Sequence, residues 1–239
     1  MFFLGIHLNG SALMKDPGEE NFNESRSHDD ILQFSIKESY LNNTLKVFSL
    51  YEWLIKNCES SLFVLKVDDD TYMNLDLFWK EIAKLPKVSK ELFIQYGYPE
   101  GPFRIKDNRR MQQYIPYEIS PIRYFHFQYV WGFAALTPMV LVKAVFAVGV
   151  CLRGLFVDDV YIGGYLPFIV GANVGHLRSV YPFSFRKHVK YVYWNNISSY
   201  SIVPDLTPDN IEVLYKEHLK SKPNMKITFP EKNESGFHI

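Results

Sequence analysis

The chain has 239 residues, of which 47% are hydrophobic and 16% aromatic, so it is long enough to bury a sizeable core. Its 26 basic and 26 acidic residues give a formal net charge of zero, which argues against a nucleic-acid-binding protein and against a polybasic membrane-binding surface. Two cysteines, Cys58 and Cys151, are too few for a disulfide scaffold or a zinc site. They could form one disulfide or remain as two buried thiols.

Apolar periodicity predicts a succession of strands and helices. A strand at residues 2–8 precedes an acidic, turn-rich loop at residues 16–30. Along residues 31–58 the apolar residues recur at helical spacing, and Asn42 or Asn43 could cap that helix. There follow a strand, an amphipathic helix that ends before a proline, another strand and an apolar helix, at residues 61–67, 74–85, 91–98 and 139–154 respectively.

This succession predicts an α/β fold in which a mostly parallel central sheet carries helices on both faces. Residues 62–67 are too continuously apolar for a strand with a solvent-exposed face, so we expect a central parallel strand there. We expect residues 2–6, 62–67 and 92–96 to be neighbouring strands of one sheet. Ligands bind at the carboxyl ends of strands in such sheets, and three consecutive aspartates, at residues 68–70, lie at such an end.

Asp68, Asp69 and Asp70 are like charges that repel one another unless something positive neutralises them. Carboxylates at the end of a strand suit a hard divalent cation such as Mg²⁺ or Mn²⁺, which bridges protein carboxylates to substrate phosphates. Because successive residues of an extended chain alternate faces, the side chains of Asp68 and Asp70 share one side. The alternative is a solvated acidic turn that caps the next helix.

A second acidic pair, Asp158 and Asp159, stands in the segment LFVDDVYIGGYL. The pair could simply cap a helix. Two acidic sites in one neutral chain also suggest a division of labour, in which one holds a metal-bound leaving group and the other abstracts a proton.

No apolar segment reaches transmembrane length, and the longest, residues 139–152, is interrupted by Lys143 and is interpreted as a core helix. The N-terminus lacks the basic region and the cleavage site of a signal peptide. Four N-x-S/T sequons favour the lumen of the secretory pathway, at Asn23, Asn42, Asn196 and Asn233.

These motifs resemble, in the same order, those of the β-1,3-galactosyltransferase family (glycosyltransferase family 31). The family's F-x-x-K-x-D-D-D-x-[FY]-x-N motif is matched by FVLKVDDDTYMN, and its E-D-V-[YF]-x-G motif by DDVYIGG. Its F-L-L-G strand is matched by FFLG, and residues 24–58 resemble a further block that carries a sequon at the position of Asn42. The family's aromatic tract and Gly-rich strand are matched by YFHFQYVWGFAALT.

The resemblance implies a GT-A-like fold and an inverting hexosyltransferase that uses Mn²⁺. Such an enzyme moves galactose or an N-acetylhexosamine from a UDP-sugar to a hydroxyl of an acceptor glycan on a glycoprotein or glycolipid, forming a β-1,3 linkage. By motif position, Asp70 and Asp68 would ligate the metal, and Asp68, Asp69 and Lys66 would serve the donor. Asp159 would be the catalytic base. The expected location is the luminal face of the Golgi membrane, with no nucleic-acid partner.

The chain also departs from the family pattern. The family's first donor-binding strand and its type II membrane anchor would precede the present start, so residues 1–239 are expected to be one catalytic domain truncated at its N-terminus. The family's metal-binding histidine falls on Pro204 or Asp205, and His176 and His188 are the nearest histidines. Asp158 replaces the motif's Glu. A second hypothesis is therefore an inactive member that serves as a glycan-binding or partner-binding module.

Overall fold

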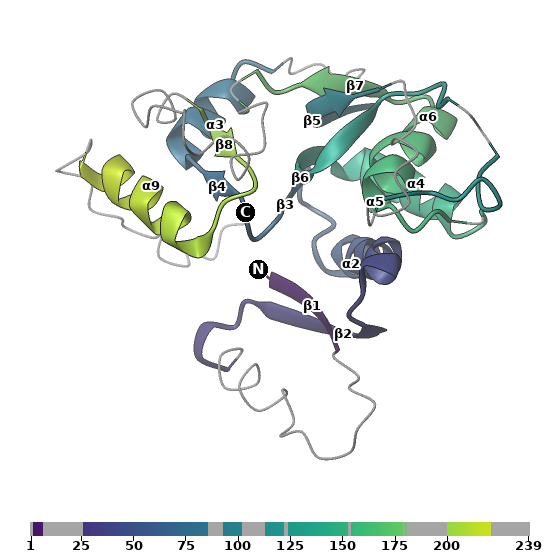
Figure 1. The fold of residues 1–239 in the computed structure, drawn as a ribbon, viewed down its shortest axis with the longest axis horizontal. Helices are drawn as coiled ribbons and strands as arrows, with labels where there is room; N and C mark the ends of the chain where they lie inside the picture. Colours follow the sequence, from purple (N-terminus) through teal and green to yellow (C-terminus); the bar gives the residue numbers. More distant parts are fainter. Residues whose placement is uncertain are drawn as a thin grey trace.

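The computed structural model describes residues 2–6, 26–85, 93–101, 113–121, 124–152, 154–178, 180 and 200–220 (Figure 1). In chain order the elements are β1 (Phe2–Ile6), β2 (Ile31–Lys37), η1 (Tyr40–Asn42), α2 (Asn43–Asn57), β3 (Phe63–Val67), β4 (Tyr72–Met73), α3 (Leu75–Ile82), β5 (Ile94–Glu100), β6 (Tyr129–Pro138), α4 (Met139–Gly149), α5 (Asp158–Val160), η3 (Tyr161–Tyr165), α6 (Leu166–Ile169), β7 (Asn173–His176), β8 (Ile202–Val203) and α9 (Pro208–Lys220). The predicted α/β class is confirmed.

The central sheet has four strands in the order β3-β6-β5-β7 and is mixed (Figure 1). β6 lies between β3 and β5 and is antiparallel to both, whereas β5 and β7 are parallel. The predictions that the sheet is mostly parallel, and that residues 62–67 and 92–96 are neighbouring strands, are therefore wrong. The two strands do run in the same direction, but the long apolar strand β6 separates them.

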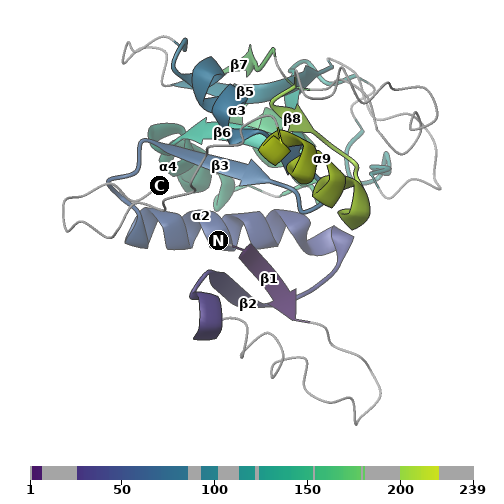
Figure 2. The same ribbon diagram turned by 90° about the vertical axis from the view of Figure 1, so that its left-hand side faces the viewer.

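The prediction that residues 2–6 belong to the same sheet as β3 and β5 is also wrong. β1 pairs in parallel with β2, with Phe2 opposite Ile31 and Leu4 opposite Gln33, in a sheet of two strands. Both views show this pair on the far side of α2 from the central sheet (Figures 1 and 2). Exposure alternates along most of β2, which is the period of a strand, so the prediction that residues 31–37 belong to a helical stretch is wrong.

β3 is packed on both faces, as its continuous apolar sequence predicts. Val64 packs against the cluster formed by α2, α4, η3 and α6, which includes the fully buried Leu141 and Leu166. Its neighbours Phe63 and Leu65 pack against the other cluster, which contains Phe78 of α3. Helices therefore cover both faces of the sheet, which confirms that prediction.

A short antiparallel pairing of two strands that are distant in sequence brings the C-terminal part of the described chain close to the end of β3. β4 and β8 pair in an antiparallel manner, with Tyr72 opposite Val203. The amide of Asn74 donates to the carbonyl of Ser201 at 2.7 Å, and the amide of Leu206 donates to the carbonyl of Asp70 at 2.8 Å. Residues 200–206 thus lie against the turn that follows β3.

Both cysteines are free thiols, so the disulfide that the sequence left open is not formed. Cys58 is half-buried against the α2–α4 cluster, whereas Cys151 is exposed rather than buried. Among the described residues, no helix has the length and apolar character needed to cross a membrane.

Candidate active site

The three consecutive aspartates form a turn directly after β3, and its backbone is held from two sides. The amide of Asp68 donates to the carbonyl of Phe133 at 3.0 Å, and the carbonyl of Asp70 accepts from Leu206. Asp69 is exposed, while Asp68 and Asp70 are half-buried. The aspartates do not cap the next helix, because Asn74 caps α3 by accepting a hydrogen bond from the amide of Leu77.

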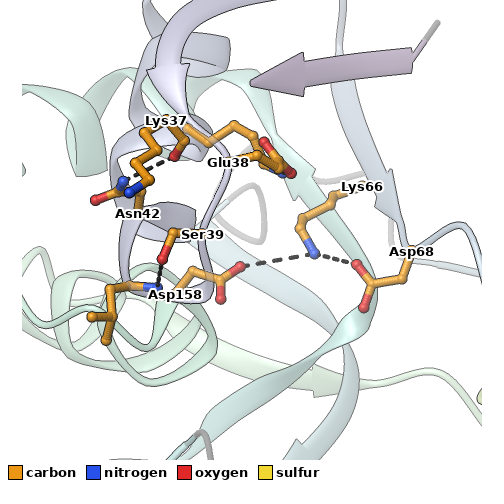
Figure 3. Close-up of polar contacts among 9 residues, drawn as sticks. Lys37, Glu38, Ser39, Asn42, Lys66, Asp68 and Asp158 are labelled. Atoms are coloured by element: carbon orange, nitrogen blue, oxygen red, sulfur yellow. Dashed lines mark hydrogen bonds and ion pairs between the residues drawn. The ribbon is translucent and has the colours of Figure 1, made fainter. Parts of the chain in front are cut away.

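Lys66, the last but one residue of β3, joins this turn to the second acidic pair (Figure 3). Its ammonium donates to Oδ1 of Asp68 and to the carbonyl of Gly132, both at 2.7 Å. It also lies 3.9 Å from Oδ2 of Asp158. The side chains of Lys66 and Asp158 are only 18% and 13% exposed, whereas that of Asp68, at 44%, reaches solvent.

The carboxylates keep Lys66 charged. Burial is the strongest single influence and favours the neutral amine, but the combined charges of Asp68, Asp158 and Asp159 outweigh it and raise the pKa of Lys66 above its usual value. The family resemblance implies that Lys66 helps to bind the UDP-sugar donor. In the structure its ammonium is held by three oxygen atoms of the protein itself, which makes it an internal counter-ion of the site.

Asp158 and Asp159 begin α5, where the helix N-terminus favours negative charge. The alternative that the pair caps a helix is not what the structure shows, because the cap residue is Val157 and the two aspartates lie in the first turn. α5 continues into the π-helical turn η3, whose Gly163 lies so close to β6 that a Cβ there would be 2.9 Å from the carbonyl oxygen of Val130. This close approach brings the two carboxylates against the central sheet.

Asp159 is half-buried and lies against Gly132 of β6. Burial and, next in size, the negative charge of Asp158 raise the pKa of its carboxyl to about 7, against the opposing effects of the Lys66 charge and of the Gly132 N–H. The pKa of the Asp158 carboxyl is raised too, by burial, with Lys66 acting against the rise. A carboxylate of this kind can accept a proton near neutral pH.

Two tyrosines that sequence reasoning missed belong to the same surroundings. The pKa of Tyr40 is raised by burial and by the carboxylates of both acidic sites. The pKa of Tyr129 is raised by burial and by the charges of Glu100 and Asp159. Both phenols thus stay protonated at neutral pH and can act as hydrogen-bond donors. Tyr40 lies within residues 24–58, which resemble a block of the family, but nothing in the sequence relates it to an aspartate more than a hundred positions away.

The described part of the chain brings together no group of three or more histidine, cysteine, aspartate or glutamate side chains that could hold a metal ion. The segment at the family's histidine position does lie beside the aspartate turn, with Asp205 in a left-handed backbone conformation (φ 62°) next to Leu206. His176 ends β7 and packs edge-on against Tyr98, with ring centres 5.6 Å apart. His188 lies outside the described residues.

Residues 1–178 match the family model described as galactosyltransferase. The chain is similar to human β-1,3-galactosyltransferase 9, with 25% identity over 169 residues that cover 70% of this chain and 44% of that relative. It is similar to the lactosylceramide 1,3-N-acetyl-β-D-glucosaminyltransferase of Xenopus tropicalis, with 26% identity over 144 residues, 59% of this chain and 37% of that relative. The chain thus spans less than half the length of these curated relatives.

Among solved structures, the chain is similar to a glycosyltransferase involved in the glycosylation of the major capsid of PBCV-1. The match covers 90% of this chain and 98% of that chain at 12% identity and a TM-score of 0.39, which is too low to bear on fold or function.

Replacing Lys66 with methionine should destabilise the protein by about 3 kcal/mol at pH 8, because it leaves buried carboxylates without their counter-ion. Lys143→Met is the matched control, since Lys143 pairs with Glu59 at 3.1 Å but both side chains are far more exposed, at 40% and 79%. That change should cost less than about 1 kcal/mol. Chemical unfolding of both variants measures the difference, and equal losses would show that Lys66 contributes no more than a surface ion pair.

Asp159→Asn should stabilise the protein increasingly as the pH rises. The folded pKa of about 7 lies above the value of about 3.9 for an unfolded aspartate, so between these values the native state alone holds the proton and its stability falls with rising pH. Asparagine cannot ionise and escapes this loss. The thermal midpoint of the variant should exceed that of the unmodified chain by more at pH 8 than at pH 5. The exposed Asp209→Asn should bring no such gain, and a pH-independent difference for Asp159→Asn would contradict the buried, proton-binding carboxyl.

Proposed function

Because the chain belongs to the galactosyltransferase family, we propose that it is an inverting hexosyltransferase that moves galactose or an N-acetylhexosamine from a UDP-sugar to a hydroxyl of an acceptor glycan, with formation of a β-1,3 linkage. Two of its relatives, a β-1,3-galactosyltransferase and a 1,3-N-acetyl-β-D-glucosaminyltransferase, support this choice of sugars and linkage. The acceptor would be carried by a glycoprotein or glycolipid. We propose the Golgi lumen as the compartment, in keeping with the sequons.

The observation that carries the proposal is the pairing of two acidic sites across one buried cation. The aspartate turn at the end of β3 and the Asp158–Asp159 pair are both held to Lys66. An in-line displacement needs a proton acceptor at one end and stabilisation of the leaving group at the other, because the attacking and departing oxygens lie on opposite faces of the sugar. The two sites supply these two roles from separate elements.

Asp159 would act as the general base. It takes the proton from the acceptor hydroxyl while that oxygen forms a bond to the anomeric carbon of the donor sugar. The bond from the anomeric carbon to the phosphate oxygen of UDP breaks on the opposite face, and the electron pair leaves with UDP, so the configuration inverts. The raised pKa of Asp159 suits this role near neutral pH, whereas Asp158 is closer to Lys66 and is the less basic candidate.

Asp70 and Asp68 would hold a divalent cation, Mn²⁺ in the family, with Asp69 exposed beside them for contact with the donor. The donor set fits to this extent, because such ions need only one or two protein carboxylates when phosphates and water complete their coordination. When bound, the ion would stabilise the negative charge of the diphosphate group. Lys66 would keep the Asp68 carboxylate oriented through its Oδ1 contact.

Asp159→Asn should lower the rate of transfer by roughly 10²–10⁴-fold, the usual contribution of a general base, and should leave UDP binding nearly unchanged. Transfer is measured at saturating donor and acceptor with UDP-galactose and UDP-N-acetylglucosamine, and UDP binding by calorimetry. The matched change Asp158→Asn should have a smaller effect on the rate. Near-normal transfer by Asp159→Asn would assign the base to another group.

Asp70→Asn should abolish the Mn²⁺-dependent part of UDP binding while the fold is kept, because an anionic ligand is lost from a cluster that repels itself without the cation. Calorimetric titration of UDP with and without Mn²⁺ measures this, with Asp76→Asn on α3 as the control. Unchanged metal dependence in Asp70→Asn would mean that the aspartates form a solvated turn only. A family member that serves as a binding module would show no metal-dependent UDP binding even in the unmodified chain.

A further inference from the structure

Gly132 lies at an irregular point of β6. Along the pairing of β5 with β6, Gly97 is opposite Ala135 and Pro99 is opposite Val130, so two steps along β5 correspond to five along β6. The extra residues of β6 form a bulge that contains Gly132. A bulge leaves backbone groups outside the regular ladder and redirects them, and such bulges are frequent next to active sites.

Both backbone groups of Gly132 are used by the site. Its carbonyl oxygen accepts a hydrogen bond from the ammonium of Lys66 at 2.7 Å. Its N–H donates to the carboxylate of Asp159. One peptide segment of the bulge therefore contacts the cation with its acceptor and the carboxylate with its donor, and so links Lys66 to Asp159.

The position also needs the absence of a side chain. A Cβ on Gly132 would lie 2.0 Å from Oδ1, 2.8 Å from Cγ and 3.1 Å from Oδ2 of Asp159. The first distance is far below van der Waals contact, so any other residue would push the carboxylate out of its place. The backbone of Gly132 is not in the left-handed region, so space alone requires glycine here.

We propose that Gly132 is a positioning residue that fixes the carboxylate of Asp159 for proton transfer, through its N–H and through the room left by its missing side chain. The inference rests on the proposed role of Asp159 as base. It adds that the bulge of β6, together with the helix that carries Asp159, determines where the basic oxygen lies. A displacement of about 1 Å is enough to reduce a rate by about 10²-fold when the geometry of reacting groups is strict.

The kinetic test is Gly132→Ala. With UDP-galactose or UDP-N-acetylglucosamine as donor and simple β-galactosides or β-N-acetylglucosaminides as acceptors, kcat should fall by about 10²-fold while KM for the donor stays within about threefold. Gly154→Ala is the control, since a Cβ there would meet the ring of Tyr161 at 3.3 Å and Cγ2 of Thr44 at 3.8 Å but no group of the site, and it should leave kcat nearly unchanged. A normal kcat for Gly132→Ala, or a loss confined to KM, would overturn the proposal.

A double-mutant cycle on stability tests the contact independently of catalysis. Gly132→Ala alone should lower the thermal midpoint by several degrees, because the new Cβ and the carboxylate cannot both be accommodated. In an Asp159→Ala background the carboxylate is gone, so the same change should have almost no effect. Should Gly132→Ala fail to fold, the double variant should fold again. Additive losses would refute the contact.

The two arms separate failure of this inference from failure of the proposed function. Absence of transfer by the unmodified chain would contradict the proposed function alone, and the stability cycle would still decide whether Gly132 positions Asp159. Full transfer by Asp159→Ala together with strong coupling in the cycle would keep the contact but remove its role in catalysis, and so would overturn the proposal.

Discussion

The site depends on one buried ammonium surrounded by acidic groups. Lys66 contacts Asp68, which follows β3, and Asp158, which begins α5. Its positive charge offsets the repulsion between these two carboxylates. Lys66 neutralises only part of the negative charge around it, since one cation faces the three carboxylates of Asp68, Asp158 and Asp159. The remaining negative charge raises the pKa of Asp159 and leaves the aspartate turn suited to a further cation.

Close backbone approach is the second constraint, and glycine permits it twice. Gly163 lets the π-helical turn η3 lie directly on β6, and Gly132 leaves room for a carboxylate on the strand itself. π-helical turns and β-bulges are both irregular, and both are common at functional sites because they re-aim groups that a regular element would keep in its own ladder. In this chain the π-helical turn η3 packs against the irregular part of β6. The irregular parts of the α/β fold therefore determine the geometry of the site.

Local sequence signals predicted individual strands and helices better than they predicted which strands pair with each other. The apolar run of β3 followed by Asp68–Asp70 predicted that the aspartate turn lies at the end of a strand. The resemblance of DDVYIGG to a family motif predicted that Asp159 acts at the same site. The place of β6 between β3 and β5 was not predictable, because strand order depends on contacts between residues that are distant in sequence. The role of Gly132 depends on a bulge that exists only in the pairing with β5, so no local pattern reveals it.

The central claim is that Asp159 is a half-buried carboxyl whose pKa lies near neutrality in the folded chain. The most direct measurement is a pH titration of the carboxyl ¹³C resonances of protein labelled at its aspartates. We predict an aspartate resonance that titrates near pH 7 and that is absent from the spectrum of Asp159→Asn. If every aspartate carboxyl completed its titration below about pH 5, close to the value of about 3.9 for an unfolded aspartate, Asp159 would be an ordinary carboxylate and this claim would be contradicted.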